Sequence, residues 1–334
     1  MNSFGRLFRV NIFGESHGES VGINIDGCPA GMPLNVLDFL PDIERRKGGT
    51  QKGTTPRQES DLPIFKAGIF NDKTTGAPIS ILFENKNTRS GDYEKLRAVP
   101  RPGHADFVAH KKFGGYEDFR GGGHFSGRLT VCLVAAGVIA KKMLALTESK
   151  IECNATILEI GGEKDLEKGL QKAIDAKDSV GGIVECRVQN LPVGLGEPFF
   201  DSVESLISHA VFAIPAVRAI EFGTGFKAAQ MFGVEHNDAI ENMQGKTVTN
   251  HAGGVVGGIT NGNEFVFRIA IKPTSSTPKE QTTLNWEKGE KETVSVKGRH
   301  DLCIALRVPV ILEAVTAMVL ADLLLLEQHI KRIV

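Results

Sequence analysis

The C-terminal segment, residues 305–330, constrains the fold more than any other part of the chain. It is apolar on almost every side, and a helix of that kind is stable in water only inside a core or a subunit interface. Its most apolar part, residues 308–326, contains Glu313 and Asp322, so it falls short of an uninterrupted membrane span. We therefore expect a buried helix and no contact with a membrane.

A glycine-rich segment, residues 101–130, leads into a second long apolar helix, predicted over residues 126–146. Three consecutive glycines at 121–123 end a loop just before Ser126, and serine is favoured as the residue that caps a helix start. The backbone N–H groups of that start would face whatever the glycines allow to approach, and histidines and arginines lie nearby. This pattern favours an anion-binding loop, although a mobile surface loop before a core helix has the same composition.

The rest of the chain reads as strands and amphipathic helices. Pairs of segments with alternating apolar and polar residues, joined by short turns, are typical of antiparallel hairpins. Strands are predicted over residues 6–13, 21–26, 63–70, 78–84, 151–160, 182–189, 217–222 and 264–271, and helices over residues 35–46, 163–176 and 202–212. Pro41 should bend or restart the first of these helices. Since no linker or internal repeat is visible, we expect a single domain, residues 1–334.

Charge and cysteine content exclude several classes of function. The chain has 39 Lys and Arg against 40 Asp and Glu, so no overall field attracts nucleic acid. Its five cysteines lie far apart without a C-x-x-C pair, which fits buried thiols in a reducing compartment better than disulfides or a zinc site. The N-terminus lacks the pattern of a signal peptide. We expect a cytoplasmic protein that binds neither nucleic acid nor a metal.

Any anionic ligand must therefore be bound by local groups of cations and hydroxyls. One group closes the first helix, where Arg46 is followed by glycines and then by Lys52 and Arg57. Another follows strand 264–271, where Lys272-Pro273-Thr274-Ser275-Ser276 offers an ammonium and three hydroxyls, the donors that a phosphate monoester needs. Both groups also fit ordinary structure, since cations stabilise helix C-termini and Thr and Ser are common in turns.

Three short motifs match known functional patterns, but the sequence around each does not have the elements that the pattern requires. Residues 14–18 match G-x-S-x-G around Ser16, but a strand follows where a nucleophile elbow needs a helix. Residues 245–247, Gly-Lys-Thr, lack the earlier glycine of a phosphate-binding loop, and residues 251–258 do not join a strand to a helix as a dinucleotide fingerprint does. His17, at the tip of the first hairpin, fits either a proton donor beside an anion or a solvated turn histidine.

Eight motifs in register cover nearly the whole chain: LFRVNIFGESHG, ERRKGGTQKGTTPRQESD, TTGAPISILFENKNTRSGDY, RPGHAD, FRGGGHFSGRLT, HAGGVVGGITNG, FRIAIKPTSS and KGRHDLCIALRVP. Together they resemble chorismate synthase. The resemblance implies an α+β fold, a β-α-β sandwich of mixed or antiparallel sheets around helices. It also implies a 1,4-anti elimination of phosphate from 5-enolpyruvylshikimate 3-phosphate to give chorismate, with reduced FMN as cofactor and no net redox change.

The resemblance further implies roles for individual residues. His17 would protonate the departing phosphate, His104 would govern protonation on the flavin N1 side, and Asp301 would remove the ring proton in the flavin N5 region. FMN contacts would come from His124, Phe125, Ser126, Ala216, Gly257, Lys272, Pro273, Thr274, Ser275, Ser276 and Arg299. The substrate, or NADP, would be bound by Arg46, Lys52 and Arg128.

Two departures from the family pattern leave details of these contacts open. Lys52 stands where the family usually has arginine, and His124-Phe125-Ser126-Gly127-Arg128 replaces the usual R-S-S-A-R. A homotetramer is expected, with a separate flavin reductase because the chain has no Rossmann fingerprint. Two rival readings are a serine hydrolase that uses Ser16 and a flavin-binding scaffold without turnover.

Overall fold

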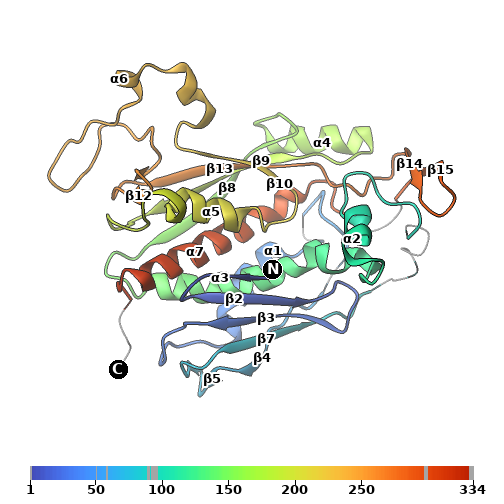
Figure 1. Cartoon of the computed structure of the whole chain (residues 1–334), viewed down its shortest axis with the longest axis horizontal. Helices are drawn as coiled ribbons and strands as arrows, with labels where there is room; N and C mark the ends of the chain where they lie inside the picture. Colours follow the sequence, from blue (N-terminus) through green and yellow to red (C-terminus); the bar gives the residue numbers. More distant parts are fainter. Residues whose placement is uncertain are drawn as a thin grey trace.

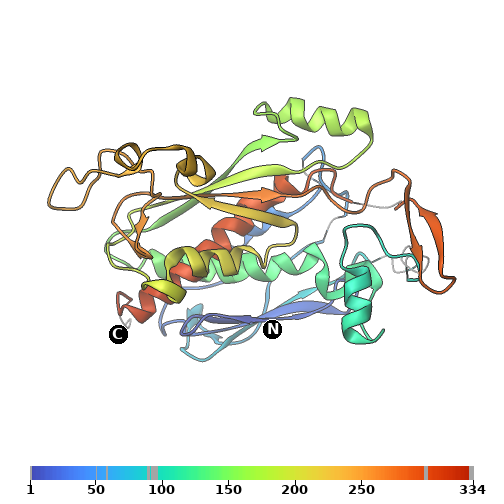
Figure 2. The same cartoon turned by 45° about the horizontal axis from the view of Figure 1, so that its top comes forward.

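The computed structural model describes residues 2–49, 51–57, 59–88, 91, 97–296 and 300–330. Two antiparallel sheets lie on either side of a layer of helices (Figure 1), and the layers stay distinct when the molecule is turned (Figure 2). One hydrophobic core extends through the helix layer to both sheets. The predicted α+β sandwich is therefore confirmed.

The first sheet is built from the N-terminal third of the chain. Its strands lie in the order β1 (Ser3–Phe4), β2 (Arg9–Gly14), β3 (Ser20–Asp26), β7 (Ile79–Glu84) and β4 (Ile64–Ala67). A short hairpin of β5 (Ile69–Phe70) and β6 (Lys73–Thr74) joins β4 to β7. Val21, Ile23 and Ile25 of β3 are fully buried, as expected where every second side chain faces the core. Both predicted N-terminal hairpins are confirmed.

The second sheet comes from the C-terminal half. Its strands lie in the order β10 (Val217–Phe222), β13 (Phe265–Ile271), β9 (Gly182–Gln189) and β8 (Glu152–Ile160), all antiparallel. Along β9, Val184, Cys186 and Val188 are fully buried. On the opposite face Glu185 accepts a hydrogen bond from Arg187 at 2.7 Å. All four strands lie where the alternating pattern predicts them.

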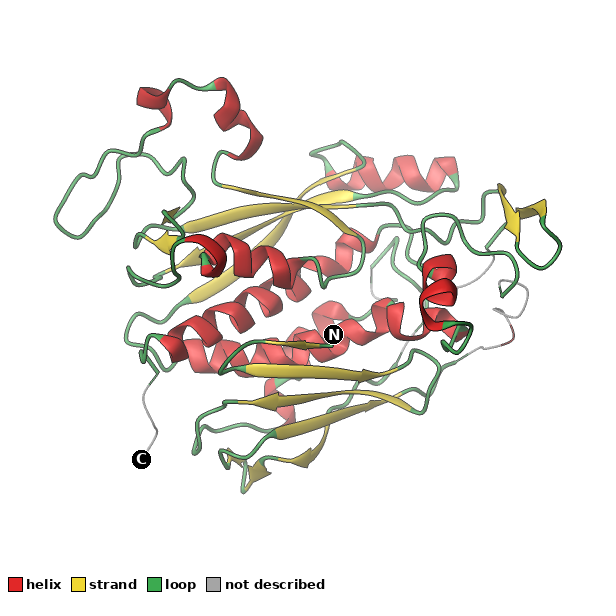
Figure 3. Ribbon diagram, viewed as in Figure 1, coloured by secondary structure: helices red, strands yellow, loops and turns green. Residues whose placement is uncertain are grey.

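The helix layer between the sheets consists of α1 (Leu40–Arg46), α3 (Thr130–Leu144), α5 (Val203–Val211) and α7 (Val308–Leu326), as Figure 3 shows. Helix α3 packs against β3, and α7 packs against β8 and β9. The two long helices approach each other closely at Gly137, where a Cβ atom would lie 2.3 Å from the Cβ of Ala314. Glycine at this position is what allows the two helices to touch.

Helix α7 confirms the predicted buried C-terminal helix. Residues 304–326 are long and apolar enough to span a membrane, yet 89% of their most apolar window is buried inside the protein. The two acidic interruptions both have partners. Glu313 accepts from Arg45 at 2.7 Å and from Lys141 at 2.8 Å, and Asp322 accepts from backbone N–H groups. The helix is thus the central core element.

Helix starts depart from the predictions where short 3-10 turns intervene. Asn35 caps a 3-10 turn, Val36–Asp38, and α1 restarts after it with Pro41 in its first turn, as predicted. Ser126 caps a second 3-10 turn, Gly127–Leu129, so that α3 itself begins at Thr130. The segment 120–125 before it is a further 3-10 stretch interrupted by the three glycines.

Several elements lie outside the two sheets and the helix layer. They are α2 (Asp106–Phe113), α4 (Leu166–Ala176), α6 (Gly233–His236), β11 (Val255–Val256), β12 (Ile259–Thr260), β14 (Gln281–Asn285) and β15 (Glu290–Val294). Of these only α4 is predicted from the sequence. Residues 225–250, here called the arm, belong to the connection from β10 to β13 and project away from the second sheet (Figure 1).

Asp322 joins the C-terminal helix to the start of the first sheet. Its carboxylate is 6% exposed and accepts from the backbone N–H groups of Arg6, Leu7 and Phe8, with Oδ1 distances of 3.1, 2.6 and 2.8 Å. An ionised carboxylate can accept several N–H hydrogen bonds at once, and its negative charge strengthens each of them. It therefore holds the turn between β1 and β2 against the far end of α7.

We predict that Asp322→Ala lowers the free energy of unfolding by about 2–4 kcal/mol, because three backbone bonds to a charged acceptor are lost and the buried N–H of Phe8 remains unpaired. Urea denaturation measures this change. Asp26→Ala is the matched control, since Asp26 pairs with Arg9 at the surface and such pairs contribute about 0–1 kcal/mol. Equal losses in the two variants would show that Asp322 has no special role.

Candidate active site

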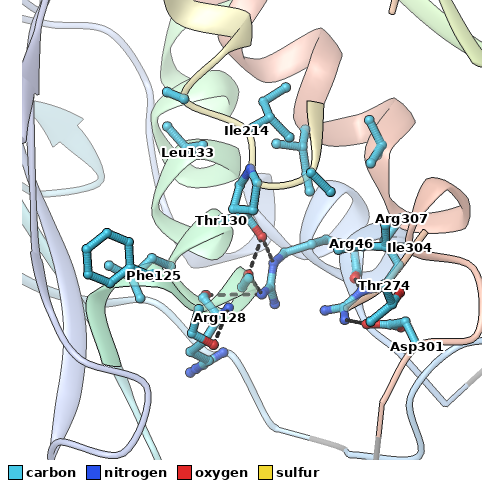
Figure 4. Close-up of a pocket in the computed structure, with 18 of the residues that line it drawn as sticks. Arg46, Phe125, Arg128, Thr130, Leu133, Ile214, Thr274, Asp301, Ile304 and Arg307 are labelled. Carbon is cyan, nitrogen blue, oxygen red and sulfur yellow. Dashed lines mark hydrogen bonds and ion pairs between the residues drawn. The ribbon is translucent and has the colours of Figure 1, made fainter. Parts of the chain in front are cut away.

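A cavity of about 840 Å³ lies between the helix layer and the loops that carry most of the predicted site residues. One wall is apolar and is formed by α3, α7, β2 and the loop before β10. Its side chains include Val10, Ile12, Leu133, Ile214, Val308, Ile311, Val315 and Met318. The opposite wall is polar. In Figure 4, Leu133 and Ile214 lie above a row of Arg46, Arg128, Arg307 and Asp301. The volume falls within the range of about 300–1,000 Å³ usual for ligand pockets.

Two buried arginines share one carboxylate at the polar wall. Arg46 and Arg128 are 2% and 6% exposed, and both bind Asp61, which is 2% exposed. Arg46 also donates from Nε to the Thr130 hydroxyl at 2.9 Å and from one Nη to the carbonyl of Gly127 at 3.0 Å. Burial alone would raise the pKa of Asp61, but the charges of Arg46 and Arg128 outweigh burial and lower that pKa.

These bonds occupy most N–H groups of the two arginines, whose part in binding the substrate stays a prediction. Arg128 donates to Asn85 Oδ1 at 2.8 Å and to the carbonyl of Glu84 at 3.1 Å in addition to Asp61. Most N–H groups of Arg46 and Arg128 are therefore directed at the protein. Arg46, Arg128 and Asp61 together carry two positive charges and one negative charge. Their net positive charge can attract an anion into the cavity even where no N–H group binds it.

The three consecutive glycines bring two histidines to the cavity wall. A Cβ atom on Gly121 would lie 2.4 Å from Cδ2 of His17, and one on Gly122 would lie 3.2 Å from Cε1 of His104. Both glycines also have φ values of +61° and +81°, which L-residues rarely adopt. The GGG sequence is thus required for close approach to both rings, and His17 and His104 do share one cavity.

Asp301 lies on the same polar wall, held from two sides. Its Oδ1 accepts from the backbone N–H of Thr55 at 2.9 Å, and its Oδ2 accepts from Arg307 at 3.0 Å. Arg307 also donates from Nε to the carbonyl of Arg46 at 2.8 Å. Helix capping does not explain Asp301, because the following 3-10 turn is capped at Cys303.

The loop from Lys272 to Ser276 forms another part of the wall. Lys272 donates from Nζ to the carbonyl of Gly103 at 2.6 Å and to the Ser275 hydroxyl at 2.7 Å. Burial and the nearby charge of Arg218 lower the pKa of Lys272. The Thr274 hydroxyl is buried and has no hydrogen-bond partner among the described residues. A buried hydroxyl without a partner beside a cavity is available to hydrogen-bond a bound ligand or water.

The cavity collects most of the predicted site residues. His17, His104, His124, Phe125, Ser126, Arg46, Arg128, Ala216, Asp301 and the loop 272–276 all line it. Lys52 does not; its Nζ lies 3.0 Å from Gln171 Oε1 at the surface. Gly257 lies in the turn between β11 and β12 and is also absent from the cavity wall. Arg299 lies outside the described residues.

Thr55, Asp61 and Arg307 also line the cavity, although the sequence does not predict them as site residues. Thr55 binds Asp301, Asp61 binds Arg128, and Arg307 binds the carbonyl of Arg46. Because the residues of each pair are distant in the sequence, spacing alone carries no signal for these contacts. Arg57, which the sequence places in the first cationic group, also lines the cavity and donates to Glu59 at 2.8 Å.

The rival reading as a serine hydrolase lacks a nucleophile. Ser16 is fully buried, and its hydroxyl lies 3.4 Å from Arg57. The serine of a G-x-S-x-G nucleophile elbow must be exposed at a strand-to-helix turn, and here β3 follows the turn. Within the described part of the chain, no group of three or more His, Cys, Asp or Glu side chains could hold a metal ion.

Comparison with known proteins identifies similar enzymes. The sequence model of the family described as chorismate synthase matches residues 8–325. The chorismate synthase of Chitinophaga pinensis is 73% identical over 333 residues, covering 100% of this chain and 99% of its own. That of Methanocaldococcus jannaschii is 40% identical, covering 97% and 96%. A solved structure, a crystal structure of chorismate synthase, matches with a TM-score of 0.74 at 25% identity, covering 97% of this chain and 93% of that chain.

We predict that Gly121→Ala displaces the His17 ring, because the new Cβ would overlap it. Histidine NMR of the purified protein should show the His17 signals moved, and turnover should fall by about 10²-fold if His17 donates a proton. Gly162→Ala is the matched control, with a φ of +79° and open space around the added carbon. An unmoved His17 signal in Gly121→Ala would refute the close packing.

Proposed function

This chain belongs to the chorismate synthase family, and we propose that it eliminates phosphate from 5-enolpyruvylshikimate 3-phosphate by a 1,4-anti route to give chorismate, with reduced FMN as cofactor. Enzymes of this family are lyases. The observation that carries the proposal is the single cavity that combines an apolar wall, an orphaned Thr274 hydroxyl and the side chains of His17, His104 and Asp301. Its volume allows a flavin and a small substrate side by side.

The residues present fit an FMN molecule. The apolar side chains of α3, α7 and the loop before β10 suit a flat aromatic ring system. The Thr274 hydroxyl lacks a partner within the described chain, and Lys272 and Ser275 add polar groups from the same loop. When bound, reduced FMN supplies the electron-rich ring that the reaction requires although it involves no net redox change. We assign the loop 272–276, His124, Phe125, Ser126 and Ala216 to FMN.

His17 is proposed as the acid that protonates the departing phosphate. It is 9% exposed and lines the cavity. Gly121 packs against its ring, which restricts the direction in which the ring nitrogens point. A histidine is suited to this role because its unperturbed pKa of about 6.5 allows proton donation near neutral pH.

Asp301 is proposed as the base that removes the ring proton. The Thr55 N–H and Arg307 each bind one of its carboxylate oxygens, so its orientation is fixed before the substrate arrives. A base in a fixed orientation loses less entropy on the way to the transition state. His104, on the same cavity wall, is proposed to govern protonation at the flavin N1 side.

The substrate carries two carboxylates and a phosphate, which require positive potential. The group of Arg46, Arg128 and Asp61 supplies a net positive charge behind the wall. Arg57 and Arg307 lie at the wall itself. We propose that these arginines attract the anionic substrate, with Lys52 contributing only if its surface loop moves toward the cavity.

We further propose a homotetramer in which Gly257 serves the flavin site of a neighbouring copy. The turn that holds Gly257 is open: among the described residues, its own chain neighbours apart, no atom would lie within 4 Å of an added Cβ. The nearby arm exposes Phe226, Phe232, Ile240 and Met243 at 74–97%, and apolar side chains exposed in such a group mark interfaces. Light scattering that finds a monomer at assay concentrations would contradict this assembly. A separate flavin reductase, the absence of NADP-dependent self-reduction and a cytoplasmic location stay predictions.

An anaerobic assay tests the reaction directly. With chemically reduced FMN and 5-enolpyruvylshikimate 3-phosphate, the protein should form chorismate and release phosphate in equal amounts. His104→Ala should lower turnover by about 10²-fold, the usual scale for a lost acid or base, while the fold persists. Binding of flavin without chorismate formation would instead support a non-catalytic scaffold.

Lys272→Ala tests the flavin loop. It should weaken binding of oxidised FMN by about ten- to a hundredfold, since one charge-assisted hydrogen bond contributes about 1.5–3 kcal/mol. Riboflavin lacks the phosphate, so its affinity should fall less than that of FMN if Lys272 Nζ binds the FMN phosphate. Fluorescence titration of the flavin measures both. Unchanged FMN affinity would show that the bonds of Lys272 to Gly103 and Ser275 are purely structural.

A further inference from the structure

Asp106 forms a compact hydrogen-bonded group with His104 that none of the roles above explains. It is the first residue of α2, directly after the turn that carries His104. Its Oδ1 lies 2.5 Å from His104 Nδ1. The carboxylate also accepts from Arg101 at three places, from the backbone N and Nε to Oδ2 at 3.0 and 2.8 Å and from Nη2 to Oδ1 at 2.7 Å.

This group fixes which nitrogen of His104 carries hydrogen. Burial would raise the pKa of Asp106, but hydrogen bonds from Arg101 and His104 hold that pKa well below its usual range. An ionised carboxylate only accepts hydrogen bonds, so the close Nδ1 atom must carry the hydrogen. Arg101 Nη2 also lies 3.0 Å from Nδ1. With the Nδ1 hydrogen directed at Asp106 this contact joins two donors, and Arg101 Nη2 donates to Asp106 Oδ1 at 2.7 Å.

The other ring nitrogen is left for a ligand. Nε2 of His104 has no hydrogen-bond partner within the described chain, and His104 lines the cavity. A Cβ atom on Gly122 would lie 3.2 Å from Cε1 and 3.4 Å from Nε2 of His104, so glycine at this position leaves room for that edge of the ring. Arg101 extends the group by donating to the Ser276 hydroxyl at 3.1 Å, which joins it to the loop assigned to FMN.

We propose that Asp106 is a positioning residue for His104, which it holds as the Nδ1–H tautomer so that Nε2 faces the ligand. A carboxylate behind a histidine orients the ring and selects the tautomer in the same way in metal sites and in catalytic triads. The expected effect of Asp106 on kcat rests on the proposed function. The tautomer itself is a property of the protein without ligand.

Solid-state ¹⁵N NMR of histidine-labelled protein without flavin or substrate tests the tautomer. The His104 signals are identified by their loss in His104→Gln. We expect the Nδ1–H form in the wild type and in Asp106→Asn, whose amide oxygen still accepts, and a mixture of tautomers in Asp106→Ala. An Nε2–H form in the wild type would overturn the proposal, and so would an unchanged tautomer in Asp106→Ala.

Kinetics provide the second readout. Asp106→Ala should lower kcat by about 10–100-fold, the scale for losing a residue that orients a functional histidine, with little change in KM. Formate should restore part of the lost kcat, because Arg101 remains to bind it beside His104. Glu185→Ala is the matched control, since Glu185 is a buried carboxylate paired with Arg187 and Arg268 on the second sheet. It should keep kcat and show no response to formate.

The outcomes separate this proposal from the proposed function. Wild-type protein that forms no chorismate would refute the function and leave the tautomer measurement standing. An active wild type whose Asp106→Ala variant keeps its kcat, or loses it without rescue by formate, would refute the positioning role. If Asp106→Ala does not fold, the isosteric Asp106→Asn decides, because a His104 in the Nε2–H form there contradicts the proposal.

Discussion

The buried carboxylate of Asp61 is the interaction on which the arrangement of the cavity depends. Arg46 ends α1, Arg128 lies in the 3-10 turn before α3, and both bind this one acid. Burying three charges costs several kcal/mol for each, and removing one partner from such a group typically costs about 3–5 kcal/mol. The helix layer and the first sheet are therefore locked together beside the cavity, since Arg128 also binds the end of β7.

The same principle of fixed polar groups extends around the cavity wall. Asp301 is held by Thr55 and Arg307, and His104 by Asp106. Asp301 and His104 are therefore held in place before any ligand binds. An enzyme gains rate from groups that need no reorganisation at the moment of reaction. In this chain, the glycines at 121–123 leave room for the rings of His17 and His104 at one wall of the cavity.

The sequence predicts the two sheets and the core helices because their apolar periodicity is strong. The sequence does not predict α2 or the β14–β15 hairpin, and the reasons differ. Helix α2 starts after Ala105 without a side-chain cap and lies within glycine-rich sequence, whereas β14 and β15 are mostly polar strands that pair as a separate two-stranded sheet. The sequence identifies Arg46 and Arg128 as site residues, but their partner Asp61 is separated from them along the chain, so the pairing becomes visible only in the fold.

A structure of the protein with oxidised FMN bound tests the central claim most directly, that the cavity between the layers is the flavin site. The account predicts the flavin ring against the apolar wall at Leu133 and Ile214, with the Thr274 hydroxyl within hydrogen-bond distance of the ligand. A flavin bound elsewhere on the chain, or a Thr274 hydroxyl still without a partner, would contradict the account.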